Sequence, residues 1–412
     1  MDYAPDEHSV LKVQHLLERT IPAFREAFRE TTLYKDMVAT VEGSHWHREA
    51  NVGVHTDMVV DHFLENYAQP YIDDTLGYDT LKLKRTHKEI VTGFLVGLFH
   101  DTGKPAARHE KTDSEGNTRF RFTGHEIISA RLWEDYVVDN WDFMRMNFGL
   151  DHFDIYRITW MIENHLPYGL KNPRKVSAFA KTLYHMFEDM GTEDLFYDCI
   201  VSDGMGRISD NHAEKSADMQ EWVSEYKRHV SKVHQEMEDT PQPDPDTQSK
   251  LYVMIGASGV GKSTFSKTLD GNVMHYSWDD LRVKRAMIDG IDLPSDNAYH
   301  VAWEYCNEPG VKFGEYQQGV FMELLATHQS IVIDNTNTSR KRRRFYIDEA
   351  RKKGYHIIGV VFPVSKRVLT ERQATRADKF VPLDASMRHF EMTSMPNLGG
   401  EVDEVIVVGH NL

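Results

Sequence analysis

The chain has 412 residues, of which 40% are hydrophobic and 27% charged, which is enough for two ordinary globular domains or one large one. The net charge of −16 argues against simple electrostatic adhesion to DNA or RNA, although it leaves room for a local basic groove. No apolar run reaches a bilayer-spanning length, no signal peptide is evident, and Cys199 and Cys306 form no CxxC pair, so we expect a reduced, cytoplasmic compartment and no membrane partner.

Residues 1–240 are predicted to form an α-helical domain. Apolar residues recur at helical spacing in 10–28 and 89–101, and residues 213–238 have the pattern of a heavily charged helix. Residues 112–122 contain a Gly-Asn turn that is typical of a small hairpin or a loop.

A proline-rich linker is predicted at 241–250, where prolines are mixed with aspartate and glutamine. Beyond it, residues 251–412 alternate short apolar runs with helical segments, a pattern typical of an α/β domain with a parallel sheet. The predicted fold class is therefore multidomain, with an all-α N-terminal domain and an α/β C-terminal domain. The apolar runs lie at 250–256, 330–335, 356–362 and 404–409.

The first of these runs leads into GASGVGKST, which matches the phosphate-binding pattern GxxxxGK[ST] between a predicted strand and a predicted helix. Its backbone N–H groups converge on phosphate oxygens, Lys262 is placed to bridge the β and γ phosphates of ATP, and Ser263 is placed to ligate Mg²⁺. An accidental match in a glycine-rich turn is the alternative, which the flanking strand and helix disfavour. The predicted nucleotide-binding residues are Gly256, Ala257, Ser258, Gly259, Val260, Gly261, Lys262, Ser263 and Thr264.

The segment WDDLR contains Asp279 and Arg282 and follows a further short apolar run, NVMHY. An aspartate near the end of a second strand is well placed to act as general base toward an acceptor hydroxyl. Arg282, three residues later on the following helix, points from the same face toward an acceptor phosphate. The alternative is that Asp279 is a helix N-cap and that Arg282 lies on a solvated face.

Further polar segments lie beyond the next strand. Residues 333–337 (IDNTN) end that strand and are expected to face the ligand crevice. The run 340–344 is either a solvated helix face or a contact for a nucleic-acid backbone. In 365–382, Arg372 and Arg376 lie four residues apart on one helix, as in a lid whose arginines neutralise charge on a transferring phosphoryl group.

Residues 250 to about 390 together resemble the polynucleotide 5′-kinase family of P-loop phosphotransferases. The resemblance implies that Asp279 is the general base, that Arg282 holds a phosphate of the acceptor strand, and that Arg376 covers the transferred phosphate. The family often has aspartate directly before the Thr-Asn pair, where this chain has Asn335, with Asp334 one residue earlier. Alternate strand residues face opposite sides, so either of the two is the residue that faces the site.

The N-terminal domain carries an ordered set of histidines and aspartates. The chain has 22 histidines and almost no cysteines, which favours mixed His/Asp metal sites over thiolate sites, and such donors suit Mn²⁺, Ni²⁺, Co²⁺ or Fe. Adjacent His100 and Asp101 can reach one centre, because an aspartate can bridge two metals. A single histidine is more often a hydrogen-bonding residue of the surface or core, and we assign His8, His62, His87, His109 and His152 to that class. The candidate ligands are His55, His100, Asp101, His125, His165 and Asp203.

Residues 45–210 resemble the HD-domain superfamily of metal-dependent phosphohydrolases through HDTGKP, the following GHE and the flanking histidines. The resemblance implies that His55, His100, Asp101 and Asp203 hold one metal. It further implies that His125 and His165 share Asp101 with a second metal, and that Lys104, one helical turn past Asp101, contacts substrate phosphate. The alternative is a structural cluster without metal.

The two halves together resemble the HD-domain polynucleotide kinases, bifunctional end-healing enzymes of bacterial and phage type. The resemblance implies ATP-dependent phosphorylation of 5′-OH ends and removal of a 3′-terminal, 2′- or 2′,3′-cyclic phosphate, with a ligase as a partner in the same pathway. A nucleoside or nucleotide kinase fused to an HD nucleotide phosphohydrolase is the first alternative, and an ATP-switched regulatory module is the second. RNA and DNA both stay open as substrates, and a homodimer is one of the open oligomeric states.

Overall fold

The computed structural model divides the chain into two compact units, which meet between Glu238 and Asp239. The residues that the structure describes are 7–42, 48–73, 80–112, 116, 118–166, 173–191, 193–208, 212–240, 243–269, 271–295, 297–375 and 381–409.

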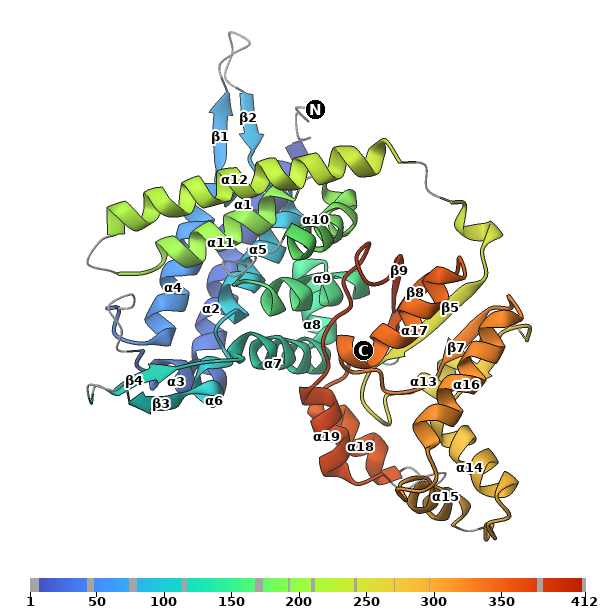
Figure 1. The fold of residues 1–412 in the computed structure, drawn as a ribbon. Coiled ribbons are helices and arrows are strands. Elements are labelled where there is room, and N and C mark those ends of the chain that lie inside the picture. Colours follow the sequence, from blue (N-terminus) through green and yellow to red (C-terminus); the bar gives the residue numbers. More distant parts are fainter. Residues whose placement is uncertain are drawn as a thin grey trace. The chain divides into compact units, whose positions relative to one another are not determined.

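The N-terminal unit is mainly helical, with two small antiparallel hairpins (Figure 1). The hairpin β3–β4 (His109–Thr112 and Thr118–Arg121) overlaps residues 112–122, where a hairpin or loop was expected, but begins three residues earlier. The hairpin β1–β2 (Pro70–Asp73 and Thr80–Leu83) was not predicted. The helices are α1 Glu7–His15, α2 Ile21–Arg29, α3 Thr32–Val38, α4 Val52–Phe63, α5 His87–Phe99, α6 Lys104–Ala107, α7 His125–Asp139, α8 Trp141–Phe148, α9 His152–Glu163, α10 Pro173–Met186, α11 Asp194–Met205 and α12 His212–Glu238. Shorter π- or 3₁₀-type turns lie at Leu16–Thr20, Leu64–Ala68 and Glu188–Met190.

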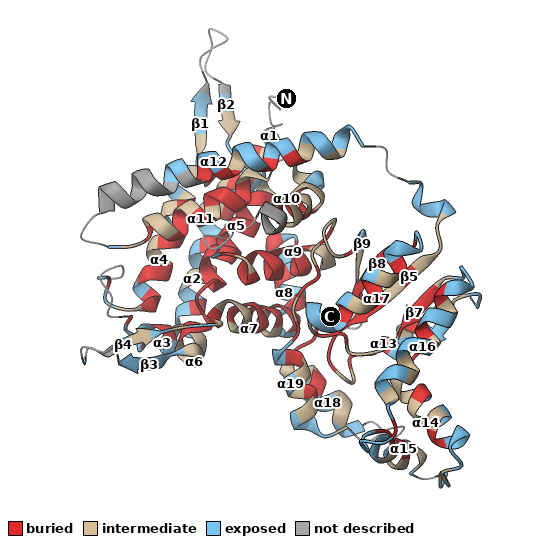
Figure 2. Ribbon diagram, viewed as in Figure 1, coloured by how far each residue is buried: buried red, intermediate tan, exposed pale blue. Residues whose placement is uncertain are grey.

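Helix α5 forms the centre of this unit. Every residue from Glu89 to Phe99 is buried, so the helix is apolar on all sides rather than along one stripe (Figure 2). It packs against α4, α7, α9 and α11. Its N-terminus is closed by a capping box between Thr86 and Glu89, which satisfies backbone N–H groups of the first turn. The C-terminal end of α5 therefore delivers His100 and Asp101 into the interior of the unit.

The C-terminal unit contains a five-stranded sheet in which each neighbouring pair is parallel. Its order β6-β7-β5-β8-β9 places β5, which leads into the phosphate-binding pattern, at the centre. The strands are β5 Lys250–Ile255, β6 Met274–Tyr276, β7 Ile331–Ile333, β8 His356–Val361 and β9 Glu404–Val407. The helices are α13 Lys262–Ser266, α14 Trp278–Ile288, α15 Ala298–Cys306, α16 Phe313–Ala326, α17 Arg340–Lys352, α18 Lys366–Thr375 and α19 Leu383–Glu391, and a 3₁₀ turn lies at Pro245–Thr247.

The predicted parallel α/β domain is thereby confirmed. Because the strands run in one direction, β5, β6 and β7 end at the same edge of the sheet, where parallel α/β folds bind ligands. Among the described helices, none combines the length and the apolarity needed to cross a bilayer.

Candidate functional site

The phosphate-binding loop follows β5 directly and leads into α13. Gly259 and Gly261 have φ angles of 92° and 103°, a region that favours glycine, and a Cβ atom on Gly259 would come within 2.4 Å of Gln373 Nε2. The buried Lys262 ammonium donates to the carbonyl oxygens of Gly256, at 3.0 Å, and Ala257. The loop therefore has the backbone conformation that a phosphate-binding loop requires.

Not every residue of this loop faces the ligand. Ala257 and Val260 are buried in the core cluster of the unit, together with Met254, Phe362 and Leu369. Their side chains belong to the core, so they could contact a nucleotide only through the backbone. Beside the loop lies a cavity of about 520 Å³, to which several other segments contribute. Its lining includes Ser258, Gly259, Gly261, Lys262, Ser263, Thr264, Trp278, Asp279, Arg282, Tyr299, Trp303, Asp334, Asn335, Thr336, Asn337, Arg342, Arg372, Val381 and His389.

Asp279 and Arg282 both line this cavity from the first turns of α14. Arg282 Nη1 donates to Asp279 Oδ1 at 2.9 Å, and the guanidinium lies 5.4 Å from the ring centre of Phe313. The N-cap of the helix is Ser277, whose side chain accepts from the backbone of Asp280. The alternative interpretation of Asp279 as the N-cap is therefore wrong, and its carboxylate lies at the cavity in an ion pair with Arg282.

The structure separates the roles of Asp334 and Asn335 at the end of β7. The Asp334 carboxylate points to the phosphate-binding loop: burial raises its pKa, but hydrogen bonds with His275 and Ser263 and the nearby Lys262 charge bring it below the ordinary value. Asn335 Oδ1 instead accepts from the backbone N–H of Trp278 at 3.0 Å. The acid beside the Ser263 hydroxyl is thus Asp334, and these two oxygen donors fit a hard cation such as Mg²⁺.

Helix α18 contacts the phosphate-binding loop through two side chains. Arg372 lines the cavity and donates to the carbonyl oxygen of Val260 at 2.8 Å, and burial lowers the pKa of its guanidinium. Gln373 donates to the carbonyl oxygen of Ser258 at 2.8 Å. Sequence reasoning missed Gln373, because only the arginines of this helix carried a charge signal. Arg376 lies outside the described residues.

The basic run at 340–344 divides into different roles. Arg342 is exposed and lines the cavity, so it is the member that can meet a ligand. Arg343 is fully buried and binds Glu401, with Nε 2.7 Å from Oε1, as well as the carbonyl oxygens of Asn337 and Ser394. Arg343 is therefore a structural residue of this unit.

Replacement of Arg343 by alanine is expected to lower the free energy of unfolding by about 3–5 kcal/mol, because it leaves the Glu401 carboxylate without its bidentate partner. Replacement of the exposed Arg342 by alanine is expected to change it by less than about 0.5 kcal/mol. Urea unfolding of the two variants measures the difference. Equal stability of both would contradict a structural role for Arg343.

His389 on α19 also lines the cavity and was not predicted. Burial lowers its pKa to about 4, with further contributions from the charges of Arg342 and Lys262, so it is neutral near pH 7. A neutral imidazole here offers hydrogen bonds without adding to the positive charge of the cavity. No motif marks this histidine in the sequence.

In the N-terminal unit, the six predicted ligand residues come together in the interior. His55 lies on α4, His100 and Asp101 follow α5, His125 begins α7, His165 follows α9, and Asp203 lies on α11. Two groups have all their ligand atoms within 4.8 Å of one another, and Asp101 belongs to both. The groups are His55, His100 and Asp101, and Asp101, His125 and His165.

Both oxygens of Asp101 face imidazole nitrogens. Oδ2 lies 3.3 Å from His55 Nε2 and 3.1 Å from His100 Nε2, and Oδ1 lies 3.0 Å from His125 Nε2 and 3.9 Å from His165 Nε2. The arrangement matches a carboxylate that bridges two centres. Asp203 completes the first group, with Oδ1 3.2 Å from His55 Nε2 and 3.8 Å from His100 Nε2.

The four imidazoles are held in one orientation. Each Nδ1 lies 2.7 to 2.9 Å from a backbone carbonyl oxygen, which can only accept, so each Nδ1 carries the proton. A neutral imidazole would then present a lone pair at Nε2, yet the Nε2 atoms of His55 and His100 are 3.4 Å apart and those of His125 and His165 are 3.3 Å apart. Facing acceptors at this distance need a proton or a cation between them. Backbone-held Nδ1 atoms are also typical of metal-binding histidines.

The charges around the cluster are consistent with that need. Burial lowers the pKa of His55, but hydrogen bonds with Asp101 and Asp203 raise it to about 9, so a proton is held there when no metal is bound. Burial and the neighbouring imidazoles lower the pKa of His165 to about 3. Burial opposes ionisation of Asp101, yet His100 and Lys104 hold its pKa well below the ordinary range. The donor set fits a divalent transition metal.

Three charged residues complete the surroundings of the cluster. Lys104 Nζ lies 2.7 Å from Asp101 Oδ2 and also binds Glu42, and Arg207 donates to Asp203 at 2.8 Å. Lys104 was predicted, whereas Glu42 and Arg207 were missed, because neither belongs to a local motif. A cavity of about 520 Å³ opens beside the cluster, and these three residues line it together with Asp101 and Arg121.

The fold and the loop geometry define the C-terminal unit as a P-loop domain, and comparisons with known proteins agree. A family model described as an AAA domain matches residues 251–394. A putative bifunctional polynucleotide kinase/RNA ligase of Autographa californica nuclear polyhedrosis virus is 28% identical over 135 residues, which are 32% of this chain and 19% of that protein. The chain thus spans about a fifth of this relative's length. These matches support a P-loop kinase domain.

Two solved structures also match parts of the chain. One is the Pnkp1/Rnl/Hen1 RNA repair complex, with a TM-score of 0.28 and 22% identity over 37% of this chain and 46% of that chain. The other is a gluconokinase from Sinorhizobium meliloti 1021, with a TM-score of 0.25 and 22% identity over 40% of this chain and 83% of that chain.

Proposed function

We propose that the C-terminal unit transfers a phosphate from ATP to the 5′-hydroxyl end of a polynucleotide. The observation that carries this proposal is the shared cavity, in which Asp279 and Arg282 lie together with Lys262 and Ser263 of the phosphate-binding loop. A carboxylate that accepts the hydroxyl proton and a loop that holds the γ-phosphate are the two parts that phosphoryl transfer to an alcohol needs.

The other residues have roles that follow from their positions. Ser263 and Asp334 would hold Mg²⁺, which neutralises charge on the transferring phosphoryl group when bound. Lys262 and Arg372 contact the phosphates of ATP, and Arg376 is proposed as a second lid arginine. All of these assignments place positive charge around the phosphoryl group, where negative charge develops.

Arg282 favours a polynucleotide over a nucleoside as acceptor. Its guanidinium pairs with Asp279. An acceptor phosphate can replace Asp279 as the partner of Arg282, and the Asp279 carboxylate can then accept the proton of the acceptor hydroxyl. Trp303 is 44% exposed at the cavity and Tyr299 lies on the same helix, so a terminal base has rings to stack on. A nucleoside has a base to stack but no phosphate for Arg282.

We further propose that the N-terminal unit is an HD-type metal-dependent phosphohydrolase. His55, His100, Asp101 and Asp203 would hold one divalent metal, and His125 and His165 would share Asp101 with a second. Bound metals of this kind polarise a phosphoester and lower the pKa of a bound water molecule. Lys104 and Arg207 at the adjacent cavity would bind the substrate's phosphate oxygens.

Together these activities would make the protein an end-healing enzyme. The N-terminal unit would remove a 3′-terminal, 2′- or 2′,3′-cyclic phosphate, the C-terminal unit would add a 5′-phosphate, and a ligase would join the ends. The alternative is a nucleoside or nucleotide kinase fused to an HD nucleotide phosphohydrolase. The kinase cavity of about 520 Å³ is within the usual range for small ligands, which keeps this alternative in the test.

One experiment tests both sites at once. An RNA with a 5′-hydroxyl and a 2′,3′-cyclic phosphate is incubated with the full chain, ATP, Mg²⁺ and Mn²⁺, and both ends are resolved; a nucleoside acceptor is assayed in parallel. We expect a 5′-phosphate and loss of the cyclic phosphate, with little phosphorylation of the nucleoside. An unchanged RNA would overturn the proposal, and preferential phosphorylation of the nucleoside would support the alternative.

A further inference from the structure

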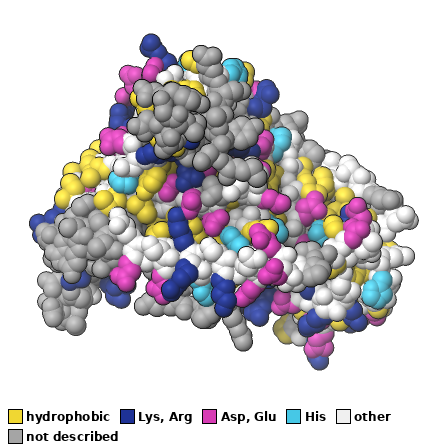
Figure 3. Space-filling view, turned by 90° about the horizontal axis from the view of Figure 1, so that it is seen from above, with side chains coloured by type: hydrophobic (Ala, Val, Ile, Leu, Met, Phe, Trp, Pro, Cys, Tyr) yellow, Lys and Arg dark blue, Asp and Glu magenta, His cyan; other side chains and the backbone are white. Residues whose placement is uncertain are grey.

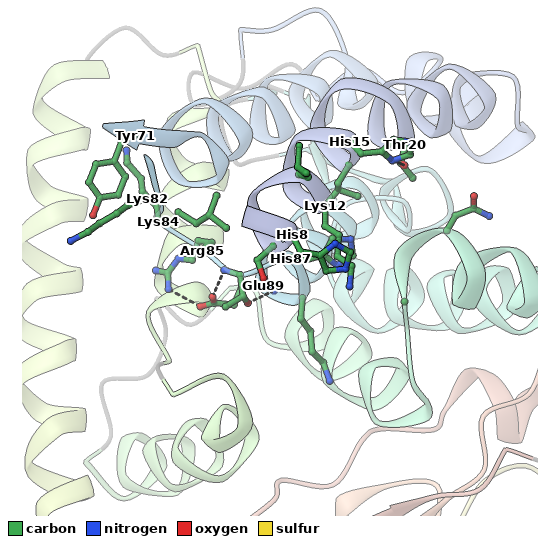
Figure 4. Close-up of a pocket in the computed structure, with 18 of the residues that line it drawn as sticks. His8, Lys12, His15, Thr20, Tyr71, Lys82, Lys84, Arg85, His87 and Glu89 are labelled. Carbon is green, nitrogen blue, oxygen red and sulfur yellow. Dashed lines mark hydrogen bonds and ion pairs between the residues drawn. The ribbon is translucent and has the colours of Figure 1, made fainter. Parts of the chain in front are cut away.

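A groove of about 1340 Å³ lies in the N-terminal unit, away from the residues assigned above (Figure 4). Its walls come from α1, from the hairpin β1–β2, from the start of α5 and from the end of α8. None of its lining residues also lines the cavity beside the metal cluster. Neither the kinase site nor the metal cluster therefore accounts for it.

The lining is strongly basic, although the chain as a whole carries a charge of −16. Among the described residues of the lining, Glu89 is the only acidic one, and it is buried in the capping box of α5. The face shown in Figure 3 carries acidic and basic side chains next to one another. The basic residues of the groove are Lys12, Lys82, Lys84, Arg85 and Lys88, with His8, His15 and His87.

Two of these cations are already neutralised. Arg85 binds Asp198 and Glu89, and Lys88 lies 2.9 Å from Asp151 and 3.2 Å from Asp154. These ion pairs join the start of α5 to α9 and α11. The groove's net positive charge then depends on cations outside these ion pairs, in particular Lys12 and Lys84.

Lys12 and Lys84 supply that charge. Both are exposed, and within the described residues neither forms an ion pair with a carboxylate. Lys84 Nζ donates to the carbonyl oxygen of Asn66 at 2.8 Å, a contact that positions the ammonium without neutralising it. Burial lowers the pKa of His87, and the charge of Lys12 lowers it further, so the Lys12 charge acts on this part of the lining.

The size and the rings of the groove indicate the class of ligand. Pockets for small molecules usually enclose about 300–1,000 Å³, and this groove exceeds that range. Tyr71 and Met146 are 41% and 71% exposed in its lining, so flat and apolar surfaces lie among the cations. A groove that combines cations with an exposed aromatic ring is typical of binding sites for single-stranded nucleic acids.

We propose that this groove binds a single-stranded segment of a nucleic acid, with Lys12 and Lys84 at backbone phosphates and Tyr71 against a base. The inference rests on the proposed function for its choice of nucleic acid over other polyanions. It adds a site for the body of the strand, apart from the centres that act on its ends. The acidic remainder of the chain repels such a strand, so binding needs a concentrated basic surface.

The test measures binding without chemistry. A fluorescein-labelled single-stranded RNA with a 5′-phosphate and a 3′-hydroxyl, which neither proposed activity alters, is titrated with the full chain in fluorescence anisotropy at several salt concentrations. For Lys12→Glu/Lys84→Glu, we expect Kd to rise by about tenfold or more at low salt. The slope of log Kd against log salt should fall by roughly 1.4, since each lysine–phosphate contact on a single strand contributes about 0.7.

The matched control is Lys35→Glu/Lys232→Glu, which changes the net charge equally at two exposed lysines of the same unit outside the groove. At about 0.15 M salt it should shift Kd by less than about threefold, because charges that do not contact the strand are largely screened there. Tyr71→Phe should bind as the wild type does, and Tyr71→Leu should bind about fivefold or more weakly if a base stacks there. Circular dichroism confirms that each variant is folded.

Three results would overturn the groove assignment. They are equal affinity of the groove and control variants, no binding by the wild type, and equal competition by poly-glutamate of the same charge, which would indicate an acidic protein as the ligand. A failure of the kinase and phosphatase assays together with groove-dependent RNA binding would overturn the proposed function alone.

Discussion

Replacement of Asp279 by asparagine is expected to lower the rate of 5′-hydroxyl phosphorylation by about two to four orders of magnitude, the range that a general base contributes. Asparagine keeps the shape of the side chain and can still contact Arg282, but it cannot accept the hydroxyl proton. ATP affinity should stay within about twofold, because the residues proposed to hold ATP lie on other segments. Single-turnover rates with a 5′-OH oligonucleotide and ATP titrations give the two quantities.

The neighbouring Asp280 provides the control. Its side chain is 77% exposed and does not line the cavity, so Asp280→Asn should retain the rate within about threefold. If Asp279→Asn were as active as Asp280→Asn, Asp279 would not be the base. If Asp279→Asn lost ATP binding as well, the fault would lie in the nucleotide site rather than in proton transfer.

The second large effect is expected at the metal cluster. Replacement of Asp101 by asparagine should abolish metal binding at both groups, because Asp101 is common to both. The rate at which a cyclic or terminal phosphate is removed should fall by about a thousandfold or more, because bound metals contribute several kcal/mol of charge stabilisation. Metal content by mass spectrometry and end analysis of the RNA measure the two effects. Kinase activity, which uses other residues, should persist.

An exposed aspartate of the same unit, Asp142, is the matched control, and Asp142→Asn should keep both metal and activity. Chelator should inactivate the wild type and Mn²⁺ should restore it. A purely structural cluster would behave differently: Asp101→Asn would change the thermal stability, while chelator would leave both stability and phosphatase activity unchanged. That outcome would refute the metal assignment.

Much of the chemistry was predictable because it depends on local pattern. A phosphate-binding loop is built from consecutive backbone groups between a strand and a helix, so its sequence alone identified Lys262 and Ser263. The four apolar runs at 250–256, 330–335, 356–362 and 404–409 likewise predicted β5, β7, β8 and β9 of the parallel sheet. The apolar run that precedes Asp279 corresponds to the fifth strand, β6. The six histidines and aspartates were found as a set, and the structure brings their ligand atoms together.

Side-chain direction was less predictable. Asp334 and Asn335 are neighbours on a strand end, and only the position of α13 and α14 around them decides that Asp334 meets Ser263 while Asn335 meets Trp278. The same holds for the basic run, since the buried Arg343 is satisfied by Glu401 and Ser394, which lie far along the chain.

By itself, then, the sequence determined the presence of a nucleotide-binding loop in a parallel α/β domain and a set of candidate metal ligands in a helical region. Tertiary structure alone decided which neighbours complete these sites, such as His389, Gln373, Glu42 and Arg207, and it alone assembled the basic groove from four separate segments. The physical reason is range: backbone geometry and hydrophobic periodicity act over a few residues, whereas charge pairing and burial depend on elements that are distant in sequence.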